Sequence, residues 1–356
     1  MKIIKKSTVL LFISILFLSS CSDNIGDSKE ISFYHWKTTL DLTAKKQEYL
    51  NSLKVNKLYI RFFDVKWVEK KNSAYPFATL QAKNNMNDTS IQIIPTVYIT
   101  NQTLKNTSTH SIHKLAQEIS SKIYRLCSSR FYQHLNNKLI HEIQFDCDWT
   151  LTTKEKYFSL IEEIRKTESY GKLNNPKISS TIRLHQVKYF EKTGVPPVDK
   201  AMLMFYNVGK ITDIETENSI LDLETVKKYL SNFDDYPLDF DIALPLFSWG
   251  VVFRDEHIVK LVNNLSIETL NEHSKFKHIE KNRFKVTENN YINQSFLYKN
   301  DEVRVEEVNQ EKLVELVKLI SEKAKNNNFN LCFYHLDENI IDNYSADDLT
   351  KIAKSE

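Results

Sequence analysis

The sequence predicts an α/β protein that folds as a (β/α)₈ TIM-type barrel with a long insertion after the seventh strand. Eight runs rich in aromatic and β-branched residues have the composition of strands. Segments with helical periodicity lie between them, so that strand and helix alternate eight times. This alternation is typical of parallel strands joined by crossover helices, and a count of eight favours closure into a barrel. An open doubly wound sheet is the alternative.

The eight strand-like runs are spread over the whole chain after its first thirty residues. They comprise residues 31–37, 57–67, 90–100, 141–150, 178–186, 200–209, 239–249 and 330–337. Apolar residues at helical spacing predict helices over residues 112–126 and 313–324. The last segment opens with Ser345 and Asp348 at the spacing of a capping box, which predicts a helix start. The segments after the second and fifth strands are short or weakly helical, which departs from a regular alternation.

The insertion after the seventh strand comprises residues 251–309. Within it, the runs SFLYK and EVRVEEV flank Asn300-Asp301, which predicts a β-hairpin. The loops that follow the strands of a barrel all rise from its C-terminal mouth, where binding sites lie. We therefore expect the insertion to form a wall or a lid beside such a site.

The first twenty residues have the organisation of a secretory signal. Three lysines precede the apolar run Val9–Leu18, which is too short to span a bilayer as a mature helix. The run ends in Leu18-Ser19-Ser20-Cys21, which resembles the lipobox of bacterial lipoproteins. We expect residues 1–20 to be removed, Cys21 to be lipidated, and residues 21–30 to form a polar tether before a barrel of residues 31–356. A signal peptide cut elsewhere, with Cys21 incidental, is the alternative.

This resemblance implies a membrane-anchored lipoprotein of the bacterial cell envelope, on the periplasmic or surface side of an outer membrane. Removing residues 1–20 removes three lysines and no acid, which changes the formal net charge from +2 to −1. A clustered positive face for nucleic acid is therefore not expected. With only four glycines between residues 31 and 356, the chain has no GxGxxG or Walker loop, and HExxH and GxSxG are also absent. We expect no cofactor and no metal.

Residues 142–150, EIQFDCDWT, pose the main functional question. Apolar and polar residues alternate, so one face of this strand should pack against the outer helices; it carries Ile143, Phe145, Cys147 and Trp149. Gln144, Asp146 and Asp148 should then point into the barrel near the strand's end. Two carboxylates roughly 6.6 Å apart along a strand are costly to bury, so one pKa should be raised, as general acid catalysis requires. The alternative is that both are buried polar anchors.

This strand resembles the DxxDxDxE strand of family 18 chitinases, with Asp146 and Asp148 at the second and third acids. Met204-Phe205-Tyr206-Asn207 is similar to that family's MxYD motif. A group of secreted bacterial glycosidase-like barrels with QxDxD and ALP strands is more similar still, through Gln144 and residues 243–245. The resemblance implies a barrel that acts on or binds a glycan.

Three positions depart from the chitinase pattern. Ile143 replaces the first Asp, Thr150 replaces the catalytic Glu, and Asn207 replaces the last Asp of MxYD. In the family, that Glu protonates the leaving oxygen. Either another inward acid has taken this role, or the barrel no longer cleaves its ligand.

Our leading hypothesis is a glycoside hydrolase-like barrel in which Asp148 is the acid/base and Asp146 tunes its pKa. Asp64, at the end of the second strand, and Asp337, at the end of the eighth, are further candidate acids, although helix caps or turns would explain each equally well. The competing hypotheses are a non-catalytic carbohydrate-binding barrel and a surface scaffold whose insertion contacts a protein partner. We expect a monomer.

The expected ligand contacts come from the strand ends. Tyr206 and Asn207 would position the substrate, and Gln144 would face it from the fourth strand. The remaining candidates are aromatic or basic and include rings that could stack on sugar faces: Trp36, Trp249, His35, His335 and Arg183. For both histidines, a role as hydrogen-bonded core residues is the alternative. For Arg183, the alternative is an ion pair with Asp148 or Asp146 across the barrel.

Overall fold

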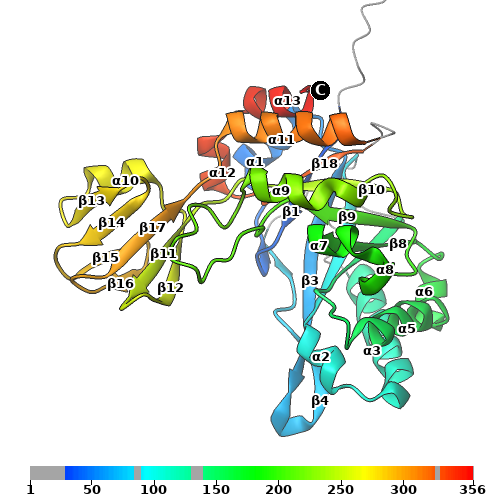
Figure 1. The fold of residues 1–356 in the computed structure, drawn as a ribbon. Coiled ribbons are helices and arrows are strands. Elements are labelled where there is room, and N and C mark those ends of the chain that lie inside the picture. Colours follow the sequence, from blue (N-terminus) through cyan, green and yellow to red (C-terminus); the bar gives the residue numbers. More distant parts are fainter. Residues whose placement is uncertain (1–28, 84–89, 130–138, 325–328, 356) are drawn as a thin grey trace, which may run out of the picture.

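The computed structural model describes residues 29–83, 90–129, 139–324 and 329–355. Its centre is a closed barrel of eight parallel strands (Figure 1). The strands are β1 (Ile31–His35), β3 (Lys57–Val68), β6 (Gln92–Ile99), β7 (Glu142–Asp146), β8 (Lys177–Arg183), β9 (Lys200–Met204), β10 (Phe240–Pro245) and β18 (Leu331–Tyr334). Strand β1 pairs in parallel with both β3 and β18, which closes the sheet. The prediction of a (β/α)₈ barrel is therefore confirmed, and the open sheet is excluded.

Each predicted strand run overlaps one of these strands, because a strand in a covered barrel needs a dense supply of apolar and β-branched side chains. The observed strands mostly end earlier than the runs. In particular, β7 ends at Asp146 and β10 at Pro245, so Asp148 and Trp249 do not lie on the strands where we expected them.

The helices around the barrel are α1 (Ala44–Ser52), α2 (Asn101–Asn106), α3 (Ile112–Cys127), α5 (Lys154–Arg165), α6 (Glu168–Lys172), α7 (Leu184–Lys188), α8 (Phe190–Thr193), α9 (Leu223–Tyr229), α11 (Gln310–Lys323), α12 (Glu338–Asn343) and α13 (Ala346–Ala353). Helix α3 buries Ile112, Leu115 and Ile119 on one face, which is the stripe that its sequence predicts. Helix α13 begins with the predicted capping box between Ser345 and Asp348. No described helix has the length and apolar character needed to cross a membrane.

Strand β3 is longer than its neighbours in the barrel. Its C-terminal part, from Asp64 to Val68, pairs with the antiparallel strand β4 (Ser73–Phe77). The resulting hairpin projects beyond the barrel and lies at the bottom of Figure 1. The short strands β2 (Thr39–Leu40) and β5 (Gln81–Ala82) pair with each other.

The insertion after β10 folds into a small subdomain beside the barrel (Figure 1, yellow). Its elements are β11 (Trp249–Arg254), β12 (His257–Asn263), α10 (Ile267–Glu272), β13 (Phe276–Glu280), β14 (Arg283–Val286), β15 (Asn290–Ile292), β16 (Ser295–Leu297) and β17 (Glu302–Glu306). Five of these strands form an antiparallel sheet in the order β12-β11-β17-β14-β13. Buried residues such as Phe284, Leu297 and Val303 give the subdomain a core of its own.

The prediction that the two runs flanking Asn300-Asp301 pair as a hairpin is wrong. Asn300 does adopt a left-handed turn conformation, with φ of 75°. However, β16 pairs with β15, whereas β17 pairs with β11 and β14. A local turn signal cannot show which strand the chain pairs with after the turn, because pairing depends on distant apolar partners.

The proposed signal peptide, Cys21 and most of the tether lie outside the described residues. Lipidation and membrane anchoring therefore stay predictions.

Candidate functional site

A pocket of about 480 Å³ opens at the C-terminal mouth of the barrel. The strands and the loops after them supply Tyr34, Trp36, Lys37, Tyr98, Asp146, Asp148, Thr181, Arg183, Met204, Tyr206, Asn207, Tyr334, His335 and Asp337. The segment that leads into the insertion supplies Phe247, Ser248 and Trp249, and the end of β12 within the insertion supplies Asn263 and Asn264. The pocket is therefore bounded by the barrel on one side and by the base of the insertion on the other.

Aromatic rings form a continuous surface across this pocket. Tyr334 lies at its centre, with ring centroids 5.9 Å from Trp36, 5.3 Å from Tyr206 and 5.8 Å from Phe247. Phe247 continues to Trp249 at 5.2 Å. The rings are tilted or edge-on to one another, with interplanar angles from 35° to 77°, and the pocket's charged and amide groups stand beside them.

Asp146 is the last residue of β7 and faces the pocket, as the alternation of its strand predicts. The Thr181 hydroxyl on β8 donates to its Oδ1 at 2.6 Å. The pKa of Asp146 is raised to about 6, mainly by burial and also by the nearby charge of Asp148, whereas the Thr181 hydrogen bond and Arg183 oppose the change. The carboxyl whose pKa rises is thus Asp146.

Asp148 lies in the loop after β7 and is exposed. Arg183, at the end of β8, donates from Nε to Oδ1 at 2.8 Å and from Nη2 to Oδ2 at 3.1 Å. Nη1 of the same guanidinium donates to the Tyr206 carbonyl at 3.4 Å. Both carboxylate oxygens of Asp148 therefore accept from one cation, in the bidentate geometry that is strongest for this pair.

Thr150 occupies the position at which the chitinase pattern has its catalytic Glu. Its hydroxyl lies 3.0 Å from that of Thr152 and 3.2 Å from that of Thr153, just before α5. Thr150 lies in the loop before α5, which begins at Lys154, and it does not line the pocket.

Asp64 does not end its strand, as we had expected, and does not line the pocket. It is fully buried within β3 and pairs with Arg61, whose Nε lies 2.6 Å from Oδ1, and with Lys66 at 3.1 Å. A carboxylate paired in this way serves as a structural anchor for the long β3 strand.

Asp337 lies at the pocket rim, after the end of β18. It caps α12 by accepting from the Asn339 backbone N–H at 3.1 Å, and it forms an ion pair with Lys37. Burial would raise the pKa of Asp337, but the hydrogen bonds from Lys37 and Asn339 outweigh burial and lower it. The alternative that we gave for this residue, a helix cap, describes its geometry.

The two histidines have different environments. His35 is buried, and its Nε2 lies 3.1 Å from the Thr39 carbonyl. Burial lowers the pKa of His35 to about 4, and the residue does not line the pocket. His335 does line the pocket, and its buried Nδ1 has no hydrogen-bond partner within the described part of the chain.

The other predicted ligand contacts lie in the pocket with one exception. Trp36, Tyr206 and Asn207 line it, and so does Trp249, although Trp249 begins β11 and does not end β10. Gln144 is buried beneath the pocket, where it accepts a hydrogen bond of 2.6 Å from the Tyr34 hydroxyl.

Sequence reasoning missed several lining residues. Tyr34 has the same strand parity as Trp36, and Thr181 the same parity as Arg183, so alternation could have found both. Tyr334 is the last residue of β18 and directly precedes His335, which was among the predicted contacts. Asn263 and Asn264 come from the insertion, and no sequence signal places the end of β12 beside the barrel. Within the described ranges, no cluster of three or more His, Cys, Asp or Glu side chains could hold a metal ion.

No protein-family model and no curated protein matches the chain. Solved structures with a similar fold include the spore cortex-lytic enzyme SleL of Bacillus megaterium QM B1551, at 13% identity, over 92% of this chain and 74% of that chain, with a TM-score of 0.54. A chitinase from Chromobacterium violaceum ATCC 12472 is similar at 9% identity, over 91% and 98%, with a TM-score of 0.52. A GH18 chitinase from Cycas revoluta in complex with (GlcNAc)3 is similar at 12% identity, over 90% and 98%, with a TM-score of 0.51. The chain thus shares the TIM-barrel fold of these proteins.

Proposed function

We propose that the chain is a glycan-binding barrel whose ligand lies in the pocket at the mouth. The observation that carries this proposal is the aromatic surface around Tyr334 with hydrogen-bonding groups beside it. Sugar rings have apolar C–H faces and a rim of hydroxyls, so they need both kinds of contact. The Cycas revoluta chitinase was solved with (GlcNAc)3, which supports a glycan as the ligand class.

Binding is favoured over hydrolysis by the state of the four candidate acids. Asp64, Asp148 and Asp337 each form an ion pair with a nearby cation. Glycosidases that use two carboxyl groups need them free for separate roles as acid and as nucleophile or base. Asp146 is the only one of the four that forms no ion pair within the described chain.

Hydrolysis through Asp146 is the second candidate, because a carboxyl with a pKa of about 6 can hold a proton near neutral pH and donate it. In this case Asp146→Asn should abolish turnover and leave the fold intact. Loss of turnover in Asp148→Asn alone would instead support Asp148 as the acid/base.

Direct binding measurements test the main proposal. The mature protein is screened against immobilised glycans and titrated with (GlcNAc)4 by calorimetry. Trp36→Ala should weaken binding, because it removes a ring from the pocket. Tyr75→Ala is the matched control, since Tyr75 is an exposed ring on β4 outside the pocket. Absence of binding to every glycan, or equal loss in both variants, would contradict a glycan site here.

We further propose that Cys21 carries a lipid that anchors the barrel in the cell envelope. The lipobox-like Leu18-Ser19-Ser20-Cys21 supports this. Mass spectrometry of the mature N-terminus should find an acylated Cys21, and Cys21→Ser should shift the protein from the membrane to the soluble fraction. Protease treatment of intact cells then distinguishes the surface side from the periplasmic side.

A further inference from the structure

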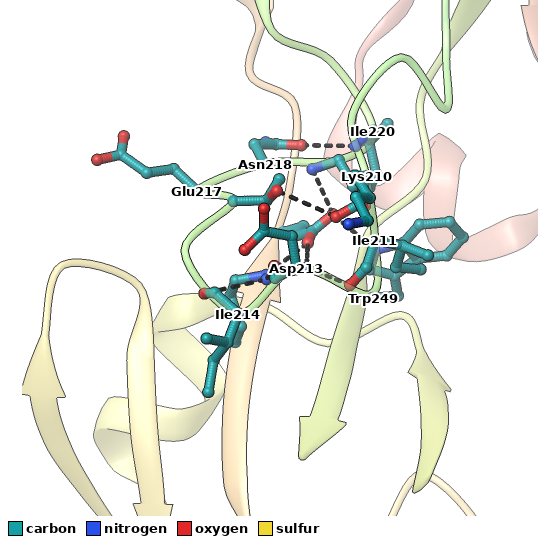
Figure 2. A network of polar contacts seen from close by, with 12 residues as sticks. Lys210, Ile211, Asp213, Ile214, Glu217, Asn218, Ile220 and Trp249 are labelled. Atoms are coloured by element: carbon teal, nitrogen blue, oxygen red, sulfur yellow. Dashed lines mark hydrogen bonds and ion pairs between the residues drawn. The ribbon is translucent and has the colours of Figure 1, made fainter. Parts of the chain in front are cut away.

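A buried ion pair lies where the insertion meets the barrel. Arg304 and Glu306, both on β17, are 1% and 0% exposed. Arg304 Nε donates to Glu306 Oε1 at 2.7 Å. The other guanidinium nitrogens donate to the carbonyls of Ile211 at 3.0 Å, Asp213 at 2.6 Å and Ile214 at 3.3 Å (Figure 2). The guanidinium therefore ties β17 to the loop between β9 and α9.

Glu306 makes a second set of contacts through its other oxygen. Oε2 accepts from the backbone N–H of Ser219 at 2.8 Å and from the Ser219 hydroxyl at 2.6 Å. It also accepts from Nε1 of Trp249 at 2.9 Å. A fully buried carboxylate is tolerated only where such partners replace water, and here every partner belongs to the loop, to β11 or to β17.

The hydrogen bond to Trp249 reaches the glycan pocket. Trp249 is the direct cross-strand partner of Glu306 in the β11–β17 ladder, and its ring contacts Phe247 in the pocket. An indole can rotate about its side-chain torsions, but an N–H fixed to a charged acceptor selects one orientation. The loop that Arg304 and Glu306 hold also carries Tyr206 and Asn207 near its start, and both line the same pocket.

We propose that Arg304 and Glu306 are a positioning pair that orients the Trp249 indole for a sugar ring and fixes the insertion as a wall of the pocket. Of the two roles expected for the insertion, wall and lid, this favours the wall. A lid would have to break several charge-assisted hydrogen bonds in a buried site each time it opened. The proposal rests on the glycan-binding function for its ligand, but the orientation of the indole can be measured without one.

The test compares two carboxylate-to-amide changes. Glu306→Gln is isosteric but has only one carbonyl oxygen; with that oxygen on the Arg304 side, its amide hydrogens face the Trp249 N–H. Asp301→Asn is the matched control: Asp301 is 1% exposed, pairs with Arg254, and lies at the opposite end of the β11–β17 ladder, away from the pocket. Trp249→Phe keeps the ion pair intact and removes only the indole.

We expect the Trp249 indole resonance, identified by its absence in Trp249→Phe, to be slow in hydrogen exchange in the native protein and in Asp301→Asn. In Glu306→Gln the chemical shift of this resonance should change, and the indole N–H should exchange its hydrogen faster. The affinity for (GlcNAc)4 should fall about tenfold in Glu306→Gln, as expected for one lost hydrogen bond to a charged group, and stay unchanged in Asp301→Asn.

An unchanged indole resonance in Glu306→Gln would overturn the proposal, as would an unchanged affinity. If the native protein does not bind (GlcNAc)4 but the indole shifts as expected, the positioning pair stands and the ligand assignment fails. If Glu306→Gln does not fold, the affinity of Trp249→Phe for (GlcNAc)4 is the test. A native affinity in that variant would overturn the proposal.

Discussion

Replacing Asp146 by Asn should change how the stability of the protein depends on pH. The folded protein raises the pKa of Asp146 from 3.8 to about 6, mainly through burial and also through Asp148. Between these two values the folded state holds the proton more tightly than the unfolded state, so the free energy of unfolding falls as pH rises. Above about pH 6 this loss is complete and amounts to about 3 kcal/mol. Asparagine does not titrate, so the variant does not lose this stability as pH rises.

The assay is urea denaturation of the native protein and of Asp146→Asn at intervals between pH 4 and pH 8. The difference between the two proteins isolates Asp146, because all other groups titrate in both. The variant should be close to the native protein at pH 4 and more stable by up to about 3 kcal/mol at pH 8. A difference that stays constant across this range would show that Asp146 gains no proton on folding and would refute the reasoning.

Four further outcomes follow from the same structure. Asp64→Ala should lower the free energy of unfolding by about 3 kcal/mol in urea denaturation, because it removes a fully buried carboxylate and leaves the half-buried Arg61 without its acid partner. Trp36→Ala should weaken (GlcNAc)4 binding about tenfold by calorimetry, with the circular dichroism spectrum unchanged. Arg183→Leu should raise the pKa of Asp146 further in a carboxyl NMR titration, because the guanidinium lowers that pKa in the native protein. The buried cysteines Cys147 and Cys332, whose thiol pKa values burial raises, should react with a thiol reagent only after unfolding.

The alternation in the fourth strand carried most of what could be predicted about the site. Ile143 and Phe145 are buried, and Trp149 stacks on Tyr157 of α5 with ring centroids 5.2 Å apart. Asp146, with the opposite parity, faces the pocket. This prediction succeeds because strand parity is a covalent property of the extended chain, and barrel closure then assigns one face to the helices.

Predictions that depended on where a strand ends were less accurate. Asp148 keeps its inward direction although β7 ends two residues earlier, since Arg183 on the next strand holds it. Trp249 reaches the pocket from the insertion because Glu306 lies opposite it on β17. These placements depend on partners 35 and 57 residues away, which local patterns do not contain.

Whether the barrel mouth can hydrolyse a glycan depends more on which carboxylates are held in ion pairs than on how many acids are present. A retaining or inverting mechanism needs two carboxyl groups with separate roles, and ion pairs with cations engage all the candidates except Asp146. One acid is sufficient only where the substrate supplies its own nucleophile, as an N-acetyl group can. A turnover assay with (GlcNAc)4 therefore gives hydrolysis its most favourable conditions. Binding of (GlcNAc)4 without turnover at pH 5 to 6, where Asp146 holds its proton at least half the time, would leave a binding barrel as the function of this pocket.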